Sequence, residues 1–97
     1  MAQEKLFENK IKRFLTDRGI WHVKYFANRM TKSGIPDILA CVDGRFVAIE
    51  VKADKGRPSE LQLWNIEQIK KSGGIAMVLY PSQFEDFKNL IIKLQGG

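Results

Sequence analysis

Apolar residues near the start of the chain recur at the three- and four-residue spacing of an amphipathic helix. Gly19 follows the last of them and is typical of a helix stop. We therefore expect a helix over residues 3–18. Its inner side would carry Phe7, Ile11, Phe14 and Leu15.

After this helix the pattern changes to short apolar runs. Residues 21–26 are rich in aromatic and β-branched types, residues 35–42 are almost entirely apolar, and residues 45–52 form a third run. Asp43-Gly44, between the second and third runs, is a strong signal for a two-residue hairpin turn. We expect three strands, of which the last two form a tight hairpin.

A second helix and a fourth strand follow along the chain. Ser59 is a good N-cap, and Gln62 occupies the capping-box position three residues later. This helix should run to about Lys71, and the short apolar run at 75–80 should be a strand. The strand at 45–52, the helix and this fourth strand would form a right-handed βαβ unit, so the two strands should be parallel.

The chain should close with a further helix after Pro81-Ser82, because apolar residues again recur on one helical side. Strands that are apolar on both sides require helices on both faces of their sheet. The pattern therefore predicts an α/β fold with a mixed sheet flanked by helices and a C-terminal helix. A length of 97 residues fits one domain, residues 1–97. The inner side of the last helix would carry Phe84, Phe87, Ile91 and Leu94.

The charge balance is basic, with 16 Lys and Arg against 11 Asp and Glu and a formal net charge of +5. Such a balance favours a polyanionic partner, most often nucleic acid. No apolar run approaches the roughly 20 residues of a membrane-spanning helix, so we expect no membrane partner. A single cysteine, Cys41, cannot form an internal disulfide, and we expect a cytoplasmic setting.

Two acidic residues, Asp37 and Glu50, lie inside the apolar strands. If Asp43 and Gly44 are the two loop residues of the hairpin, counting back from the turn places Asp37 opposite Glu50. Directly opposed residues have Cβ atoms about 4.5–5.5 Å apart. Buried carboxylates at that separation repel each other, and a divalent cation such as Mg²⁺ would compensate them.

Lys52 follows Glu50 by two positions and should point to the same face of its strand, about 7 Å away along the chain. An ion held by Asp37 and Glu50 would polarise a phosphate and acidify a water. Lys52 would then orient that water or stabilise charge in the transition state. An ordinary Glu50–Lys52 ion pair is the alternative, but the agreement of turn, register and residue type favours a catalytic site.

The Gly-Ile-Pro-Asp run at 34–37, the Glu-Val-Lys run at 50–52 and Gln62 together resemble the PD-(D/E)XK nuclease superfamily, in particular its stand-alone virus-type replication–repair nuclease (VRR-NUC) domains. The resemblance covers nearly the whole chain and implies a restriction-endonuclease-like αβββαβ core. It implies Mg²⁺- or Mn²⁺-dependent cleavage of phosphodiester bonds in DNA. It also implies metal ligation by Asp37, Glu50 and the Val51 backbone carbonyl, with Lys52 as the catalytic lysine.

Two other residues have competing interpretations. Related junction-resolving nucleases carry a Glu in the first helix, and Glu8 stands at a comparable distance from the helix end, although the helical phase puts Glu4 nearer the middle of the apolar stripe. Gln62 either caps its own helix or faces the active site, where the superfamily places a Gln. We favour Glu8 as an additional metal ligand and Gln62 as a catalytic residue.

Other residues complete the expected picture. His22 should be structural and Cys41 a small core residue. Large apolar residues, including Trp21, Trp64 and the Phe84–Phe87 pair, exceed what a small core needs and suggest a homodimer. A rim of basic residues would bind phosphates: Lys24, Arg29, Lys32, Lys55 and Arg57.

The leading function is therefore a structure-selective DNA endonuclease that acts on branched or four-way junction DNA. A non-catalytic basic DNA-binding module and an RNA nuclease are the alternatives.

Overall fold

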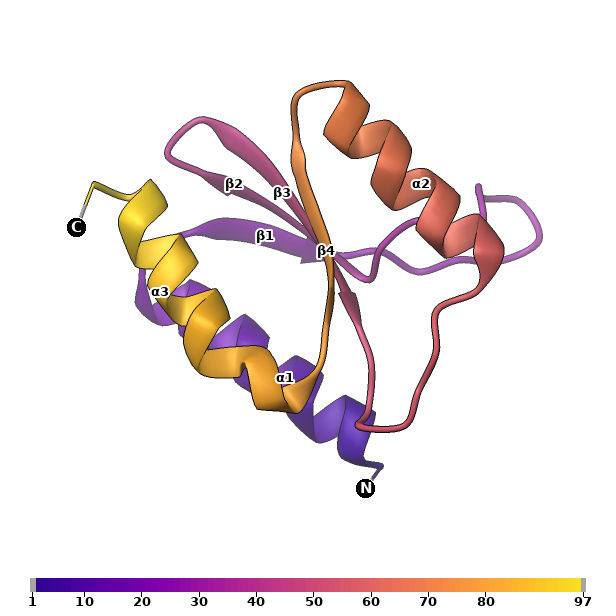
Figure 1. Ribbon diagram of the computed structural model, residues 1–97, viewed down its shortest axis with the longest axis horizontal. Coiled ribbons are helices and arrows are strands. Elements are labelled where there is room, and N and C mark those ends of the chain that lie inside the picture. The colour runs from indigo at the N-terminus through magenta and orange to yellow at the C-terminus, as the bar shows by residue number, and fades with distance from the viewer. Residues whose placement is uncertain (1, 97) are drawn as a thin grey trace.

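The computed structural model describes residues 2–96 and contains one four-stranded sheet with helices on both faces (Figure 1). The order of elements and the α/β class agree with the pattern predicted from the sequence. Within the described residues, no helix is both long enough and apolar enough to cross a bilayer. The elements are α1 (Gln3–Asp17), β1 (Trp21–Lys24), β2 (Ile38–Val42), β3 (Arg45–Val51), α2 (Glu60–Lys71), β4 (Ile75–Leu79), a 3₁₀ turn (Pro81–Gln83) and α3 (Phe84–Leu94).

The strands lie in the order β1-β2-β3-β4. The pairs β1–β2 and β2–β3 are antiparallel, and β4 runs parallel to β3, to which α2 connects it. The β2–β3 hairpin has the predicted register, with Val42 opposite Arg45 next to the turn. Asp43 and Gly44 both have positive φ, 49° and 83°, as the favoured two-residue hairpin turn requires.

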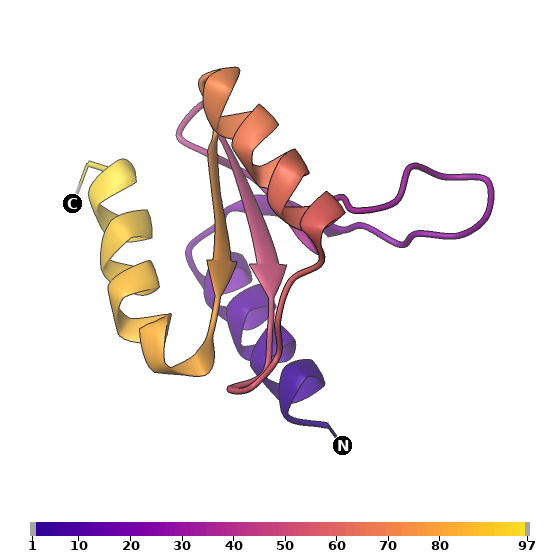
Figure 2. The same cartoon turned by 45° about the vertical axis from the view of Figure 1, so that its right-hand side comes forward.

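Both β1 and β2 are shorter than the sequence predicted. β2 begins at Ile38, and its pairing with β3 stops at Ile38 opposite Ile49. Pro36 has no N–H to donate to a ladder, which helps to explain why regular pairing ends here. The Tyr25 N–H donates to the Asp37 carbonyl at 2.8 Å, and the segment between these residues projects from the body as a long loop (Figure 2).

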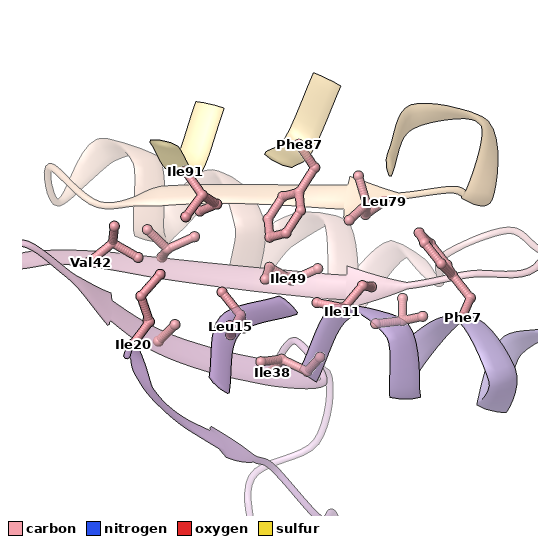
Figure 3. Packing of buried hydrophobic residues seen from close by; sticks show 13 residues of the cluster. Phe7, Ile11, Leu15, Ile20, Ile38, Val42, Ile49, Leu79, Phe87 and Ile91 are labelled. Atoms are coloured by element: carbon pink, nitrogen blue, oxygen red, sulfur yellow. The ribbon is translucent and has the colours of Figure 1, made fainter. Parts of the chain in front are cut away.

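The larger core lies between the sheet and the pair of helices α1 and α3. Ile11 and Leu15 of α1 face Ile91 and Phe87 of α3 across the β3 residue Ile49 (Figure 3). Phe84 packs at the edge of this core against Phe7 and Phe14. Aromatic packing within the chain therefore uses both Phe84 and Phe87, as predicted for the inner side of the last helix, so this pair is not part of an excess of apolar residues left for a partner subunit.

The smaller core lies under α2, which packs mainly over β3 and β4. There Ile66 contacts a group that includes Ala48 and Ala76. Because α2 leaves the same side of β1 and β2 largely uncovered, Cys41 is exposed, contrary to the expectation that it is a core residue. We call this uncovered surface the open sheet face; its exposed members are Trp21, Val23, Cys41 and Phe46.

Candidate active site

Asp37 lies just before β2 and bonds across to the end of β3. Its Oδ2 accepts the backbone N–H of Val51 at 2.9 Å. The regular ladder stops one residue short of Asp37, so this side chain closes the sheet end in place of a backbone pair. The carboxylate is 22% exposed and therefore remains within reach of solvent and a ligand.

Glu50 is the penultimate residue of β3 and is only 1% exposed. Its Oε2 lies 3.1 Å from Nζ of Lys52, while its Oε1 is buried and has no hydrogen-bond partner among the described residues. Burial and then the charge of Asp37 raise the Glu50 pKa to about 7, although Lys52 opposes the shift. Glu50 is thus a carboxylate with one oxygen free to accept a proton or a cation.

Glu8, on the sheet side of α1, is 4% exposed and lies among three lysines. It pairs with Lys24 at 2.7 Å, Lys12 at 3.0 Å and Lys5 at 3.3 Å. Burial raises the pKa of Glu8, but the hydrogen bonds from these lysines outweigh it and lower the pKa to about 2. Glu4 is exposed, because the first turn of α1 buries no side chain, so Glu8 is the acid of α1 that is buried, although Glu4 is nearer the middle of the inner stripe by helical phase.

Lys24, in β1, links Glu8 to Asp37. Its ammonium donates to Oε1 of Glu8 at 2.7 Å and to Oδ1 of Asp37 at 3.4 Å. Burial lowers the pKa of Lys24, but the two carboxylates more than offset this and raise it. The sequence predicts Lys24 on the phosphate-binding rim, whereas in the structure its ammonium pairs with two acidic side chains of the site.

Gln62 caps its own helix. Its Oε1 accepts the Ser59 backbone N–H at 2.8 Å, and the Gln62 N–H donates to Oγ of Ser59 at 3.1 Å. This reciprocal pair is a complete capping box. The structure therefore favours the capping interpretation over a catalytic Gln62, since the amide oxygen is used by the helix terminus.

The other basic residues of the expected rim are exposed and lie on two loops. Arg29 and Lys32 belong to the projecting β1–β2 loop, where the Tyr25 hydroxyl donates to the Lys32 carbonyl. Lys55 and Arg57 belong to the loop between β3 and α2. These four side chains carry charge that no carboxylate of the described chain pairs within 4 Å.

The acidic groups only partly assemble the expected metal-ligand set. Asp37 and Glu50 come together, but Glu8 reaches them only through Lys24. Within residues 2–96, no group of three or more His, Cys, Asp or Glu side chains is placed to hold a metal ion. The unpartnered Oε1 of Glu50 beside a second carboxylate nevertheless fits a hard divalent cation, which prefers oxygen ligands.

Sequence reasoning missed the lysine cluster around Glu8. The helical spacing of Lys5 and Lys12 from Glu8 was visible and predicts ion pairs along α1. The role of Lys24 had no such signal, because β1 meets α1 only through tertiary packing. His22, expected to be structural, places Nδ1 2.9 Å from the Ile20 carbonyl.

The comparison with known families agrees with this geometry. The model of the archaeal Holliday junction resolvase (Hjc) family matches residues 2–86. That match covers Glu8, Asp37, Glu50 and Lys52, and extends from α1 into α3. No curated protein matches the chain significantly. The narrower resemblance to VRR-NUC domains is not shown by this match. With most of its length matched, the chain belongs to the archaeal Holliday junction resolvase family, a family of endonucleases within the PD-(D/E)XK superfamily.

Proposed function

We propose that this protein is a Mg²⁺- or Mn²⁺-dependent endonuclease that hydrolyses phosphodiester bonds in four-way junction DNA. The observation that carries the proposal is the buried Glu50, which lies beside Asp37 and Lys52 and whose Oε1 has no hydrogen-bond partner in residues 2–96. A structural ion pair would be expected to satisfy both carboxylate oxygens, since an unmade buried hydrogen bond costs about 1–3 kcal/mol. A site that receives a cation explains the free oxygen.

The chemistry follows from the roles of these side chains. Asp37 and Glu50 would hold the divalent ion, with the Val51 carbonyl as a further proposed ligand and Glu8 nearby. When bound, the ion supplies Lewis-acid activation of the phosphate and acidifies water. Lys52, held beside Glu50 at 3.1 Å, donates its N–H groups to the attacking water or to the phosphate oxygens that gain charge. Water adds to phosphorus, one P–O ester bond breaks, and the leaving oxygen takes up a proton.

DNA binding would use the two basic loops. Arg29 and Lys32 in the projecting loop, and Lys55 and Arg57 before α2, present exposed charge to phosphates. Such contacts position the backbone and carry no base specificity, which suits an enzyme that selects DNA shape. The projecting loop leads directly into Asp37, so a strand held by this loop would pass close to the acidic cluster (Figure 2).

A second copy of the chain is the proposed partner. Cleavage of both strands at a two-fold symmetric junction calls for two sites held in a fixed relation, and C2 dimers are the commonest oligomers. The open sheet face offers the apolar centre that such an interface needs, with Trp21 65% and Phe46 45% exposed. An apolar hollow continues from it toward α2, lined in part by Leu39, Phe46 and Ile69.

The two alternative functions make different demands on the site. A non-catalytic DNA-binding module would use the basic loops but has no use for the free oxygen of Glu50. An RNA nuclease would use the same acidic groups, so only the choice of substrate separates it from the proposal. The cytoplasmic location inferred from the cysteine count stays a prediction.

One assay tests the proposal against both alternatives. Purified protein is incubated with linear, flapped and four-way DNA, and with four-way RNA, in the presence of Mg²⁺, Mn²⁺ or EDTA. We expect cleavage of four-way DNA, loss of cleavage in EDTA, and slower cleavage of linear DNA. Binding without cleavage under every ionic condition would favour the DNA-binding module, and preferential cleavage of RNA would favour the ribonuclease.

A further inference from the structure

Lys24 occupies a position in the acidic cluster that its place in the sequence does not suggest. Its ammonium lies 2.7 Å from Glu8 Oε1 and 3.4 Å from Asp37 Oδ1, and the side chain is 20% exposed. The lysine thereby joins an acid of α1 to an acid at the start of β2. A positive charge already fills the space between two groups of the expected ligand set.

The partners of these two acids differ in number. Glu8 also pairs with Lys12 and Lys5, so it keeps two cations without Lys24. For Asp37, Lys24 is the one cationic side chain within 4 Å in the part of the chain that the structure describes. Asp37 is held independently by the Val51 N–H through its other oxygen. Loss of the Lys24 charge would therefore leave Oδ1 of Asp37 without its cationic partner. The Val51 N–H would still hold the other oxygen and position the side chain.

We propose that Lys24 is a built-in counter-ion that stabilises the acidic cluster when no metal is bound and that a divalent cation must displace. The inference rests on the proposed metal dependence. A cation that approaches Asp37 meets repulsion from the Lys24 ammonium and must compete with it for Oδ1. Lys24 is thus a positioning residue that weakens ion binding and holds the ion-free site together.

The proposal predicts a gain of affinity, which damage to the fold would not produce. Lys24→Met keeps the length and apolar stem of the side chain but removes its charge. We expect this variant to bind Mn²⁺ about tenfold more tightly than the wild type, the scale of one partly screened charge. Lys24→Arg, which keeps the charge, should show no gain. Lys12→Met is the matched control, because Lys12 pairs with Glu8 at 3.0 Å but does not pair with Asp37.

Isothermal titration of each variant with Mn²⁺ measures the affinity directly, and thermal unfolding in EDTA and in Mn²⁺ gives a second readout. Lys24→Met should melt at a lower temperature than the wild type in EDTA, because the repulsion between Asp37 and Glu50 is less screened. Addition of Mn²⁺ should raise the melting temperature of this variant by more than it raises that of the wild type. Lys24→Gln serves in the same way if the Met variant does not fold.

Several outcomes would overturn the proposal. Equal or weaker Mn²⁺ binding by the uncharged Lys24 variants would make Lys24 a structural residue or a ligand-supporting one. The same gain in Lys12→Met would show a general charge effect. If the wild type binds Mn²⁺, these results leave the proposed nuclease function standing. If neither the wild type nor any Lys24 variant binds Mn²⁺, the metal dependence and the counter-ion proposal both fail.

Discussion

Asp37 accepts the backbone N–H of Val51 at 2.9 Å, and this bond joins the start of β2 to the end of β3 beyond the last regular pair of the hairpin. The bond fixes one oxygen of Asp37 and brings its charge to bear on the buried Glu50. The acidic pair is therefore positioned by the backbone of the sheet, so that its charge and its placement can be separated by mutation.

Asp37→Asn should abolish cleavage while the protein stays folded, because the amide oxygen can still accept the Val51 N–H but the charge needed by the metal is gone. Glu50→Gln should do the same and relieve carboxylate repulsion, so each variant should be as stable as the wild type or more stable. Cleavage of a four-way junction and thermal unfolding in EDTA check both effects. Glu4→Gln, at an exposed acid on α1, is the control and should cleave normally. Near-normal cleavage by either active-site variant would refute the assignment.

Lys52→Ala should keep metal and DNA binding but lose at least about a hundredfold in cleavage rate, the scale of removing one electrostatic stabiliser of a transition state. The reason is that Lys52 pairs with Glu50 without being needed as a ligand. Single-turnover cleavage and Mn²⁺ titration measure the two properties separately. Lys70→Ala, at an exposed surface ion pair, provides the comparison. Loss of Mn²⁺ binding by Lys52→Ala would show a structural role instead.

Stability without metal should depend on pH through Glu50. Its pKa is about 7 in the folded chain against an ordinary value of 4.5, so the folded state binds the proton more tightly than the unfolded state does. Glu50 should therefore make the protein progressively less stable as pH rises from about 4.5 to about 7 in EDTA. Unfolding curves measured at a series of pH values should show that Glu50→Gln lacks this loss of stability between about pH 4.5 and pH 7. If the stability of the wild type and of Glu50→Gln depended on pH in the same way, Glu50 would not be the cause.

The open sheet face should carry the dimer contact. Trp21→Asp or Phe46→Asp should give a monomeric mass by light scattering at micromolar concentration, because each places a charge at the apolar centre of the interface. Paired cuts in a four-way junction should then give way to single nicks. Leu6→Asp, at an exposed apolar residue of α1 with 53% exposure, should remain dimeric. A monomeric wild type that makes unpaired nicks would refute the dimer and leave the nuclease assignment standing.

The elements, the hairpin and the closeness of Asp37 to Glu50 could all be predicted from the amino-acid pattern alone. These features depend on local rules: a two-residue turn at Asp43-Gly44 sets the register, and strand alternation places Lys52 on the side of Glu50. The capping box of Ser59 and Gln62 was also visible in the sequence. The sequence could not decide whether the Gln62 amide caps the helix or faces the active site. In the structure this amide caps its own helix, because the Ser59 N–H that it accepts lies only three residues away in the sequence.

The side chains that surround this pair depend instead on how the helices and strands pack together. Glu8 rather than Glu4 is buried, since α1 meets the sheet only beyond its first turn. Cys41 is exposed because α2 covers β3 and β4 and leaves β1 and β2 largely open. Lys24 lies between Glu8 and Asp37 because packing brings together a helix, an edge strand and a loop end that no sequence spacing relates. Spacing along one helix or one hairpin can be read from the chain, whereas the charge that neutralises a buried acid comes from whichever element packs against it.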